Sequence, residues 1–226
     1  MSQARERILN RVRQGLAAHA GDDLRRARVQ SWISNHTRGT TPSRALGEAP
    51  ALTTLFLKMA EVSGATCTVV ASKSELPSSI AEFLRSHNIT TSLRAGADPL
   101  LAMLDWESEP QLALSNGPAE PDDTVGLSVA SSGVAETGTL VLTSGADNPT
   151  TLNFLPETHI IALPASRLYA TYEDAWDALR EVHRQTILPR AVNFITGPSR
   201  TADIEQTLLM GAHGPRRLHV FLIEDA

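Results

Sequence analysis

The chain has 226 residues, 42% hydrophobic and 20% charged, which predicts one globular domain with at most an added arm. A net charge of -5 gives no basic face for phosphates, so nucleic-acid binding is not expected. The single cysteine, Cys67, excludes an internal disulfide framework, a cysteine zinc site and a self-contained iron–sulfur centre in this chain. No cluster of His, Asp and Glu has metal-ligand spacing, so no metal site is predicted.

The first fifty residues predict an arm and a linker. Residues 2–20 place Ile8, Leu9, Val12 and Leu16 at helical spacing, and residues 22–36 continue a helix-compatible pattern. Arginines crowd the first thirty residues, against three acidic residues. Residues 37–50 collect Gly, Pro, Ser and Thr without periodicity. We therefore expect a basic amphipathic helical arm over 1–36, a linker over 37–50 and an α/β domain over 51–226.

No secretory core or bilayer-spanning run is recognisable, because no segment approaches the roughly 18 to 20 apolar residues that cross a membrane. The arm carries acidic residues and little serine, which argues against a transit sequence. A cytoplasmic protein without a membrane span is therefore predicted.

Helices and strands alternate along the domain. A helix is expected from Leu52 to a cap at Gly64, a strand over 66–71, a helix opened by a Ser79–Glu82 capping box, and a strand over 89–93. Further strands are expected over 111–115, 125–130, 139–143, 159–163, 191–196 and 218–223, with a helical turn over 151–155 and helices over 172–183 and 201–210. Thr171 and Asp174 resemble a capping box at the start of the helix over 172–183. This order predicts an open, mostly parallel sheet with helices on both faces. In such sheets ligands bind beyond the carboxyl ends of the strands.

Residues 133–142, Gly-Val-Ala-Glu-Thr-Gly-Thr-Leu-Val-Leu, place one carboxylate between two glycines beside an apolar strand. Gly133 and Gly138 would let the backbone approach a ligand, and Glu136 would act as nucleophile, base or hydrogen-bond acceptor. Thr137 and Thr139 add hydroxyls to this candidate site. The alternative is structural: Glu136 caps a turn by accepting backbone N–H bonds, and the glycines serve the bend.

A second motif follows the strand expected over 191–196. Its loop offers Gly197, Ser199, Arg200 and Thr201 before the helix expected over 201–210. The N–H groups of a helix start, two hydroxyls and a guanidinium favour a small anion. The alternative is an ordinary capped helix, with Arg200 paired to a nearby acid.

His213 follows that helix and could bring an imidazole acid or base to the same place, or it could be a turn residue. The loop contains neither a P-loop nor a dinucleotide-binding fingerprint.

Together, residues 133–142 and 195–205, followed by Gly-Ala-His-Gly-Pro at 211–215, resemble the signature of the LUD-domain family of lactate-utilisation proteins, in particular its small C subunits. The resemblance covers roughly residues 50–224. It implies an open α/β sheet of the ribose-5-phosphate isomerase, CoA-transferase and 5-formyltetrahydrofolate cyclo-ligase type. It also implies a place in a cytoplasmic, iron–sulfur-dependent system that oxidises L-lactate to pyruvate.

A chain with one cysteine cannot hold that system's redox centre, so iron–sulfur clusters are expected in cysteine-rich partner subunits and no cofactor in this chain. A non-redox subunit that binds a small anionic ligand or assembles the complex is then predicted, rather than a complete enzyme. Two alternatives stay open at this point. One is a stand-alone transferase or ligase acting on a CoA ester, a folate or a sugar phosphate, and the other is a small-molecule sensor.

Overall fold

The computed structural model describes residues 3–17, 23–184, 187–201 and 209–225. By their contacts, the residues divide into two compact units, Met1–Thr40 and Thr41–Ala226. The first unit contains two helices and the second contains all of the strands in the described ranges.

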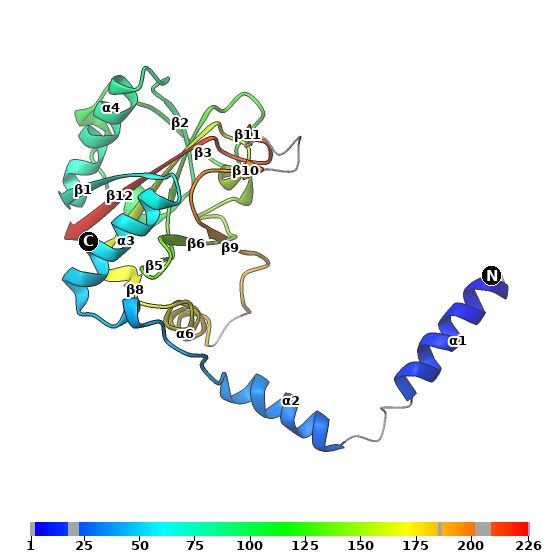
Figure 1. Ribbon diagram of the computed structural model, residues 1–226. Helices are drawn as coiled ribbons and strands as arrows, with labels where there is room; N and C mark the ends of the chain where they lie inside the picture. The colour runs from blue at the N-terminus through cyan, green and yellow to red at the C-terminus, as the bar shows by residue number, and fades with distance from the viewer. Residues whose placement is uncertain (1–2, 18–22, 185–186, 202–208, 226) are drawn as a thin grey trace. The chain divides into compact units, whose positions relative to one another are not determined.

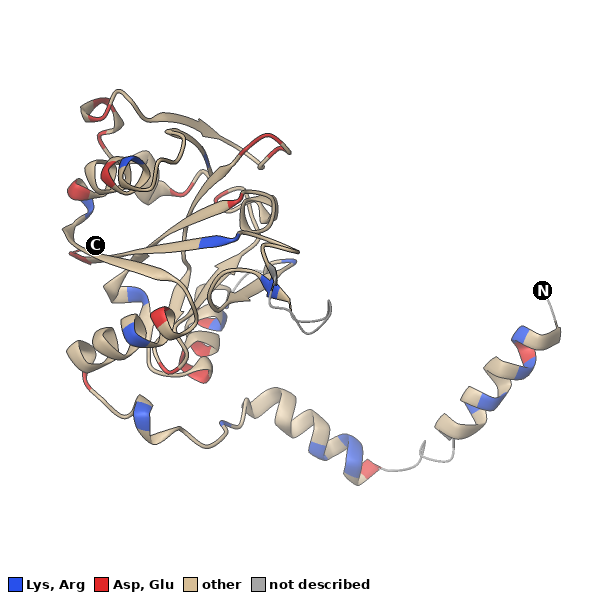
Figure 2. Ribbon diagram, turned by 45° about the horizontal axis from the view of Figure 1, so that its top comes forward, with Lys and Arg blue, Asp and Glu red and all other residues tan. Residues whose placement is uncertain are grey.

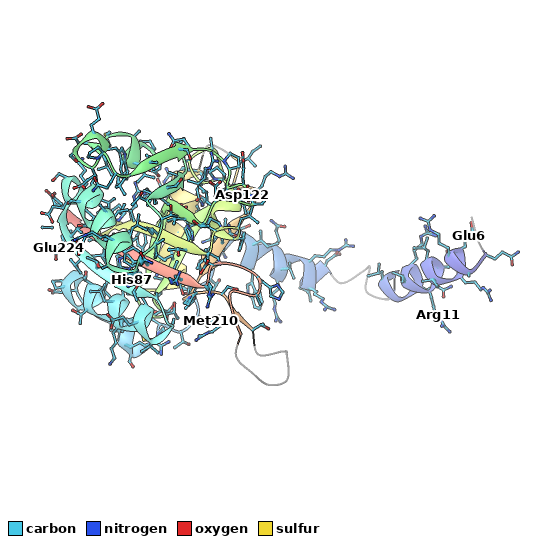
Figure 3. The ribbon with its side chains drawn as sticks, turned by 90° about the horizontal axis from the view of Figure 1, so that it is seen from above. Glu6, Arg11, His87, Asp122, Met210 and Glu224 are labelled. Carbon is cyan, nitrogen blue, oxygen red and sulfur yellow. The ribbon has the colours of Figure 1, made fainter. Side chains whose placement is uncertain are left out.

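The first unit consists of helices α1 (Gln3–Ala17) and α2 (Asp23–Asn35), as the sequence predicted. Basic residues, blue in Figure 2, recur along both helices, and Figure 3 shows the side chains of Glu6 and Arg11 projecting from α1. The apolar stripe of α1 is exposed, with Ile8 at 64% and Leu16 at 69%, and no described residue of α2 is buried. An amphipathic helix with an uncovered apolar stripe lacks the packing that normally stabilises it in water.

The second unit is built on a six-stranded sheet in the order β1-β12-β7-β4-β2-β3, in which every pair of neighbours is parallel. Its central strand, β7, is buried along its whole length. The strands are β1 (Thr66–Ser72), β2 (Ser92–Ala95), β3 (Ala113–Asn116), β4 (Val125–Val129), β7 (Thr158–Pro164) and β12 (Arg217–Asp225). The predicted α/β class and mostly parallel sheet are confirmed.

A second sheet of four strands, in the order β8-β5-β6-β9, was not predicted. It contains β5 (Ser132–Val134), β6 (Thr139–Thr143), β8 (Leu168–Tyr169) and β9 (Val192–Ile195). The β5–β6 and β6–β9 pairs are antiparallel, whereas β5 and β8 are parallel. Strands of two and three residues are too short to show an alternating pattern, which is why the sequence did not reveal β5 and β8.

The helices form layers on the two sheets (Figure 1). Helix α4 (Leu76–Ser86) and the short α5 (Pro99–Ala102) cover one face of the six-stranded sheet, while α3 (Ala49–Val62) and the four-stranded sheet cover the other. Helix α6 (Tyr172–Val182) packs on the far side of the four-stranded sheet. Helices thus lie on both faces of the six-stranded sheet, as expected, and the small sheet takes the rest of the second face.

Alternate residues of the central strands supply both cores. Ile160 and Phe221 face the α4 side, and Ile161 and Val220 face the α3 side, all of them fully buried. Because both faces are covered, β7 and β12 are apolar almost without a break, as is typical of buried parallel strands. The 3₁₀ turns are η1 (Ser43–Ala45), η2 (Lys73–Glu75), η3 (Trp106–Ser108), η4 (Thr150–Asn153) and η5 (Ala165–Arg167).

Helix α4 begins at Leu76, not at the Ser79–Glu82 pair, so that predicted capping box is wrong. Pro77 lies in its first turn, where a missing N–H costs nothing, and Leu76 and Ile80 are fully buried. The capping box predicted for α6 is confirmed. Asp174 N donates to Thr171 Oγ1, and Thr171 N donates to Asp174 Oδ2.

The helix predicted over 201–210 is wrong at both of its ends. Strands β10 (Arg200–Thr201) and β11 (Leu209–Met210) pair antiparallel as a hairpin, and residues 202–208 lie outside the described residues. Figure 3 labels Met210 on this hairpin.

Among the residues that the structure describes, no group of three or more His, Cys, Asp or Glu side chains could hold a metal ion. In the same residues, no helix has both the length and the apolar character that crossing a membrane requires.

Two histidines are buried inside the second unit. His219 is 3% exposed, hydrogen-bonds Thr66 Oγ1 through Nδ1 at 2.7 Å and stacks on Phe83 with ring centroids 3.9 Å apart. Burial, and secondarily the nearby His87, lowers the pKa of His219 to about 4. His159 is fully buried, and burial lowers its pKa to about 3.

The protein should therefore lose stability as the pH falls below about 6.5. In that range both imidazoles are protonated in the unfolded chain but stay neutral in the folded protein. The free energy of unfolding therefore decreases, by about 1.4 kcal/mol per pH unit for each histidine. The loss should continue until the pH approaches the folded-state values near 4 and 3. Urea unfolding of His219→Asn at several pH values should show about half of the histidine-dependent slope. The exposed His36→Asn is the matched control, and an unchanged slope in His219→Asn would contradict this account.

Candidate functional site

A cavity of about 330 Å³ lies where β9 leads into the β10–β11 hairpin, and we call it the hairpin cavity. Its walls come from η4 and the residue after it, from the loop between β9 and β10, from the loop before β12, and from strand residues beneath them. The lining residues are Asn153, Phe154, His159, Phe194, Ile195, Thr196, Gly197, Pro198, Ser199, Arg200, His213, Gly214, Pro215 and Leu218. The second sequence motif and the His213 segment are thus brought together, as the sequence predicted.

The hairpin cavity lies at the amino end of the central strands. His159 is the second residue of β7 and pairs in register with Leu218, the second residue of β12. The sequence placed the ligand beyond the carboxyl ends of the parallel strands. Only for β9, in the smaller sheet, is the cavity at a carboxyl end.

Backbone hydrogen bonds hold the loop that carries Ser199. Its N–H donates to Pro215 O at 2.8 Å, and its carbonyl accepts from Gly211 N at 2.7 Å. The Ser199 hydroxyl also accepts from His213 N at 3.3 Å. Because Ser199 N is paired and Thr201 belongs to a strand, the expected anion cradle at a helix start is not formed there. An anion at this place would therefore be bound by side chains, mainly the exposed Arg200, and not by the N–H groups of a helix start.

Two buried polar side chains in the cavity wall were missed by the sequence reasoning. Asn153 is 1% exposed, and neither its amide oxygen nor its amide nitrogen has a hydrogen-bond partner. His159 bonds Ser128 Oγ through Nε2 at 3.0 Å, and its Nδ1 has no partner. Since its pKa is about 3, His159 is neutral near pH 7. An unpaired buried polar group costs about 1–3 kcal/mol, so both side chains favour a ligand or water that pairs with them.

No sequence signal separated Asn153 and His159 from ordinary residues. Asn153 lies in a polar turn, and His159 begins an apolar strand. Only the fold shows that both are buried and that they line the same cavity as Arg200.

Glu136 lies in the tight turn between β5 and β6 and is 6% exposed. Its Oε1 accepts the backbone N–H of Tyr172, the first residue of α6, at 3.2 Å. Its own N–H donates to Ala170 O at 3.2 Å. A carboxylate at a helix N-terminus is stabilised by the free N–H groups and the helix dipole. Glu136 thus accepts a backbone N–H, as in the structural alternative, but from the start of α6 and not from its own turn. A role as nucleophile or base stays a prediction.

A cluster of four hydroxyls lies beside Glu136. Thr139 Oγ1 is 2.7 Å from Thr137 Oγ1, 2.9 Å from Tyr172 Oη and 2.6 Å from Thr196 Oγ1. Thr139 is fully buried, so these bonds satisfy a hydroxyl that would otherwise be costly. Thr196 also lines the hairpin cavity and therefore connects the two motifs.

The motif glycines are required by close packing within the protein. A Cβ added at Gly138, whose φ is +66°, would lie 2.2 Å from Ala60 N in α3. At Gly197, with φ +72°, it would lie 2.1 Å from Ser63 O, and at Gly133 it would lie 2.7 Å from the Leu163 side chain. The close backbone approach that the sequence suggested is thus made to α3 and β7.

The two motifs are neighbours in the fold, because β6 pairs with β9 and Leu140 lies opposite Ile195. However, the hairpin cavity is lined by residues of the second motif, namely Gly197, Ser199 and Arg200, together with His213. Glu136 and the other predicted site residues, Gly133, Thr137, Gly138, Thr139 and Thr201, lie outside its wall. Their ligand-binding roles stay predictions.

Residues 122–223 match the family model described as LUD domain. The chain is similar to lactate utilization protein C of Geobacillus thermodenitrificans, with 35% identity over 121 residues that cover 53% of this chain and 50% of the relative. The protein of the same name from Bacillus subtilis is 33% identical over 121 residues, with the same coverage, and that from Anoxybacillus flavithermus is 38% identical over 101 residues, covering 45% of this chain and 44% of the relative. The chain therefore spans about half the length of the curated relatives that it matches.

A crystal structure of a DUF162 family protein from Deinococcus radiodurans superposes with a TM-score of 0.57 and 22% identity, covering 78% of this chain and 99% of that chain. This likeness supports the fold. The family match and the curated relatives together confirm the resemblance seen in the two motifs: residues 122–223 match the LUD domain, and about half of the chain is similar to lactate utilization C proteins.

Proposed function

We propose that the protein acts in lactate utilisation as a non-redox subunit that binds a small carboxylate, lactate or its product pyruvate, in the hairpin cavity. The role in lactate utilisation is supported by the relatives named lactate utilization protein C. The observation that carries the binding site is the unpaired Asn153 and His159 in the wall of a cavity that also contains Arg200.

The cavity offers a matching set of groups for a 2-hydroxy or 2-oxo acid. Arg200 supplies a guanidinium, which suits the planar geometry of a carboxylate. Among the described residues, no acidic side chain forms an ion pair with it. Asn153 can both donate and accept, so it can pair with a hydroxyl or with a carbonyl oxygen.

The number of electrons released indicates which subunits carry the redox centres. Oxidation of L-lactate to pyruvate removes two electrons and two protons, and the electrons need an acceptor. An iron–sulfur cluster requires several thiolates, whereas this chain supplies only Cys67, whose pKa is raised to about 11 by burial and by Glu61. We infer that cysteine-rich partner subunits in the cytoplasm carry the redox centres.

The arm is suited to contact those partners. Its amphipathic helix α1 exposes Ile8, Val12 and Leu16 on one face, and its arginines surround them. Burying such a stripe against a partner would supply the packing energy that the helix lacks.

Arg200→Gln should weaken the binding of pyruvate or L-lactate at least about tenfold, because hydrogen bonds to a charged group contribute about 1.5–3 kcal/mol. Titration calorimetry measures this, with Arg200→Lys as the variant that keeps the charge. Lactamide, which lacks the charge, is the control ligand and should be insensitive to the substitution. If both variants bind the acids like the unmodified protein, the carboxylate does not bind at Arg200.

Asn153→Leu should abolish binding without destabilising the fold. The substitution removes two unpaired buried polar atoms and nearly keeps the volume, so the unfolding free energy should stay constant or rise by about 1 kcal/mol. Thermal unfolding and calorimetry on the same sample separate the two effects. A large loss of stability with intact binding would mean that Asn153 is a structural residue.

Deleting residues 1–36 should abolish co-purification with the iron–sulfur partner proteins while leaving carboxylate binding intact. Ile8→Ser combined with Val12→Ser should have the same effect, since it removes the apolar stripe. Arg13→Gln on α1 is the matched control and should retain the partners. Normal co-purification after the deletion, or growth on lactate without the gene, would contradict the assembly role.

A further inference from the structure

A second cavity, of about 340 Å³, lies at the carboxyl ends of the strands, and we call it the carboxyl-end cavity. Ser131 follows the end of β4, Thr143 is the last residue of β6, and Arg167 follows the end of β7. Helix α6 closes the other side with Ala178 and Leu179. Figure 1 shows α6 beside β5 and β8, the strands that contribute Ser132 and Tyr169 to the cavity lining. No residue lines both this cavity and the hairpin cavity.

The polar side of this cavity is cationic and rich in hydroxyls. The half-buried Arg167 is anchored by one bond, in which Nη1 donates to Ala130 O at 3.2 Å. Ser131 Oγ and Thr143 Oγ1 bond each other at 2.9 Å, and Tyr169 adds a phenol. The lining includes no Asp or Glu, and its permanent charge is the guanidinium of Arg167.

Arg167 is held in place yet retains donors for a ligand. A guanidinium has five N–H donors, and the bond to Ala130 O uses only one of them. Among the described residues, no acidic side chain forms an ion pair with Arg167. A partly buried cation without a counter-ion favours an anion, and planar oxyanions match its fork of donors.

We propose that the carboxyl-end cavity binds a small organic oxyanion, a carboxylate or a phosphate ester on a short carbon skeleton. Arg167 and the hydroxyls of Ser131 and Thr143 contact the oxyanion, and Leu179 and Ala178 contact the carbon skeleton. The position is the one that open parallel sheets generally offer to ligands, beyond the carboxyl ends of their strands. The site is separate from the carboxylate site proposed at Arg200.

The test is titration calorimetry of the full chain with three probes: inorganic phosphate, glycerol 3-phosphate and pyruvate. Arg167→Gln should weaken the preferred probe at least about tenfold, and Arg167→Lys should weaken it less. Arg85→Gln, which removes an exposed guanidinium of α4 that lines neither cavity, is the matched control and should leave that probe unchanged. Preference for glycerol 3-phosphate over pyruvate assigns a phosphate ester, and the reverse assigns a carboxylate.

A second variant guards against misfolding of Arg167→Gln. Ala178→Phe fills the cavity from the side of α6 and leaves Arg167 intact, so it should also abolish binding. Amide NMR shifts provide the location: the probe should perturb Tyr169 and Thr143 in the unmodified protein. Binding that survives both substitutions, or no binding by any probe, would overturn the proposal. Pyruvate binding that depends on Arg200 alone would support the hairpin cavity and overturn a carboxylate here.

Discussion

The packing of two glycines against the end of α3 positions the loop that lines the hairpin cavity. Gly138, in the β5–β6 turn, lies against the backbone of Ala60, and Gly197, after β9, lies against the carbonyl of Ser63. Any Cβ at either position would overlap backbone atoms, which cannot move aside as a flexible side chain can. These contacts hold the four-stranded sheet against α3, which packs in the same core as the six-stranded sheet. They thereby place the loop of the hairpin cavity beside the start of β7.

This arrangement leaves two cavities, one at each end of β7. The hairpin cavity lies at the amino end of β7 and contains neutral buried groups, Asn153 and His159, with a cation at Arg200. The carboxyl-end cavity lies past the end of the same strand and contains Arg167 with a set of hydroxyls. One buried strand thus connects two polar regions, because His159 lies at its amino end and Arg167 follows its carboxyl end, with the apolar residues of β7 between them.

Much of the fold was readable from the sequence because long, strongly patterned segments determine their own type. The apolar run of β7, the capping box of α6 and the glycine after α3 identified their elements correctly. The sequence did not reveal β5 and β8, since two or three residues carry no period. It also misread residues 201–210, where pairing between Arg200 and Met210 outweighs the helical preference at the ends of the segment.

By itself, the sequence determined the α/β class, the basic arm and the LUD motifs, since these depend on local pattern and on residues close together along the chain. It also brought Gly197, Ser199, Arg200 and His213 forward as a group. Only the tertiary structure decided that Glu136 accepts the N–H of Tyr172 at the start of α6 and that Asn153 and Arg167 line cavities. The physical reason is that burial and hydrogen-bond satisfaction depend on neighbours distant in sequence. The residues next to a polar residue in the sequence do not determine whether its side chain is exposed, hydrogen-bonded or left without a partner.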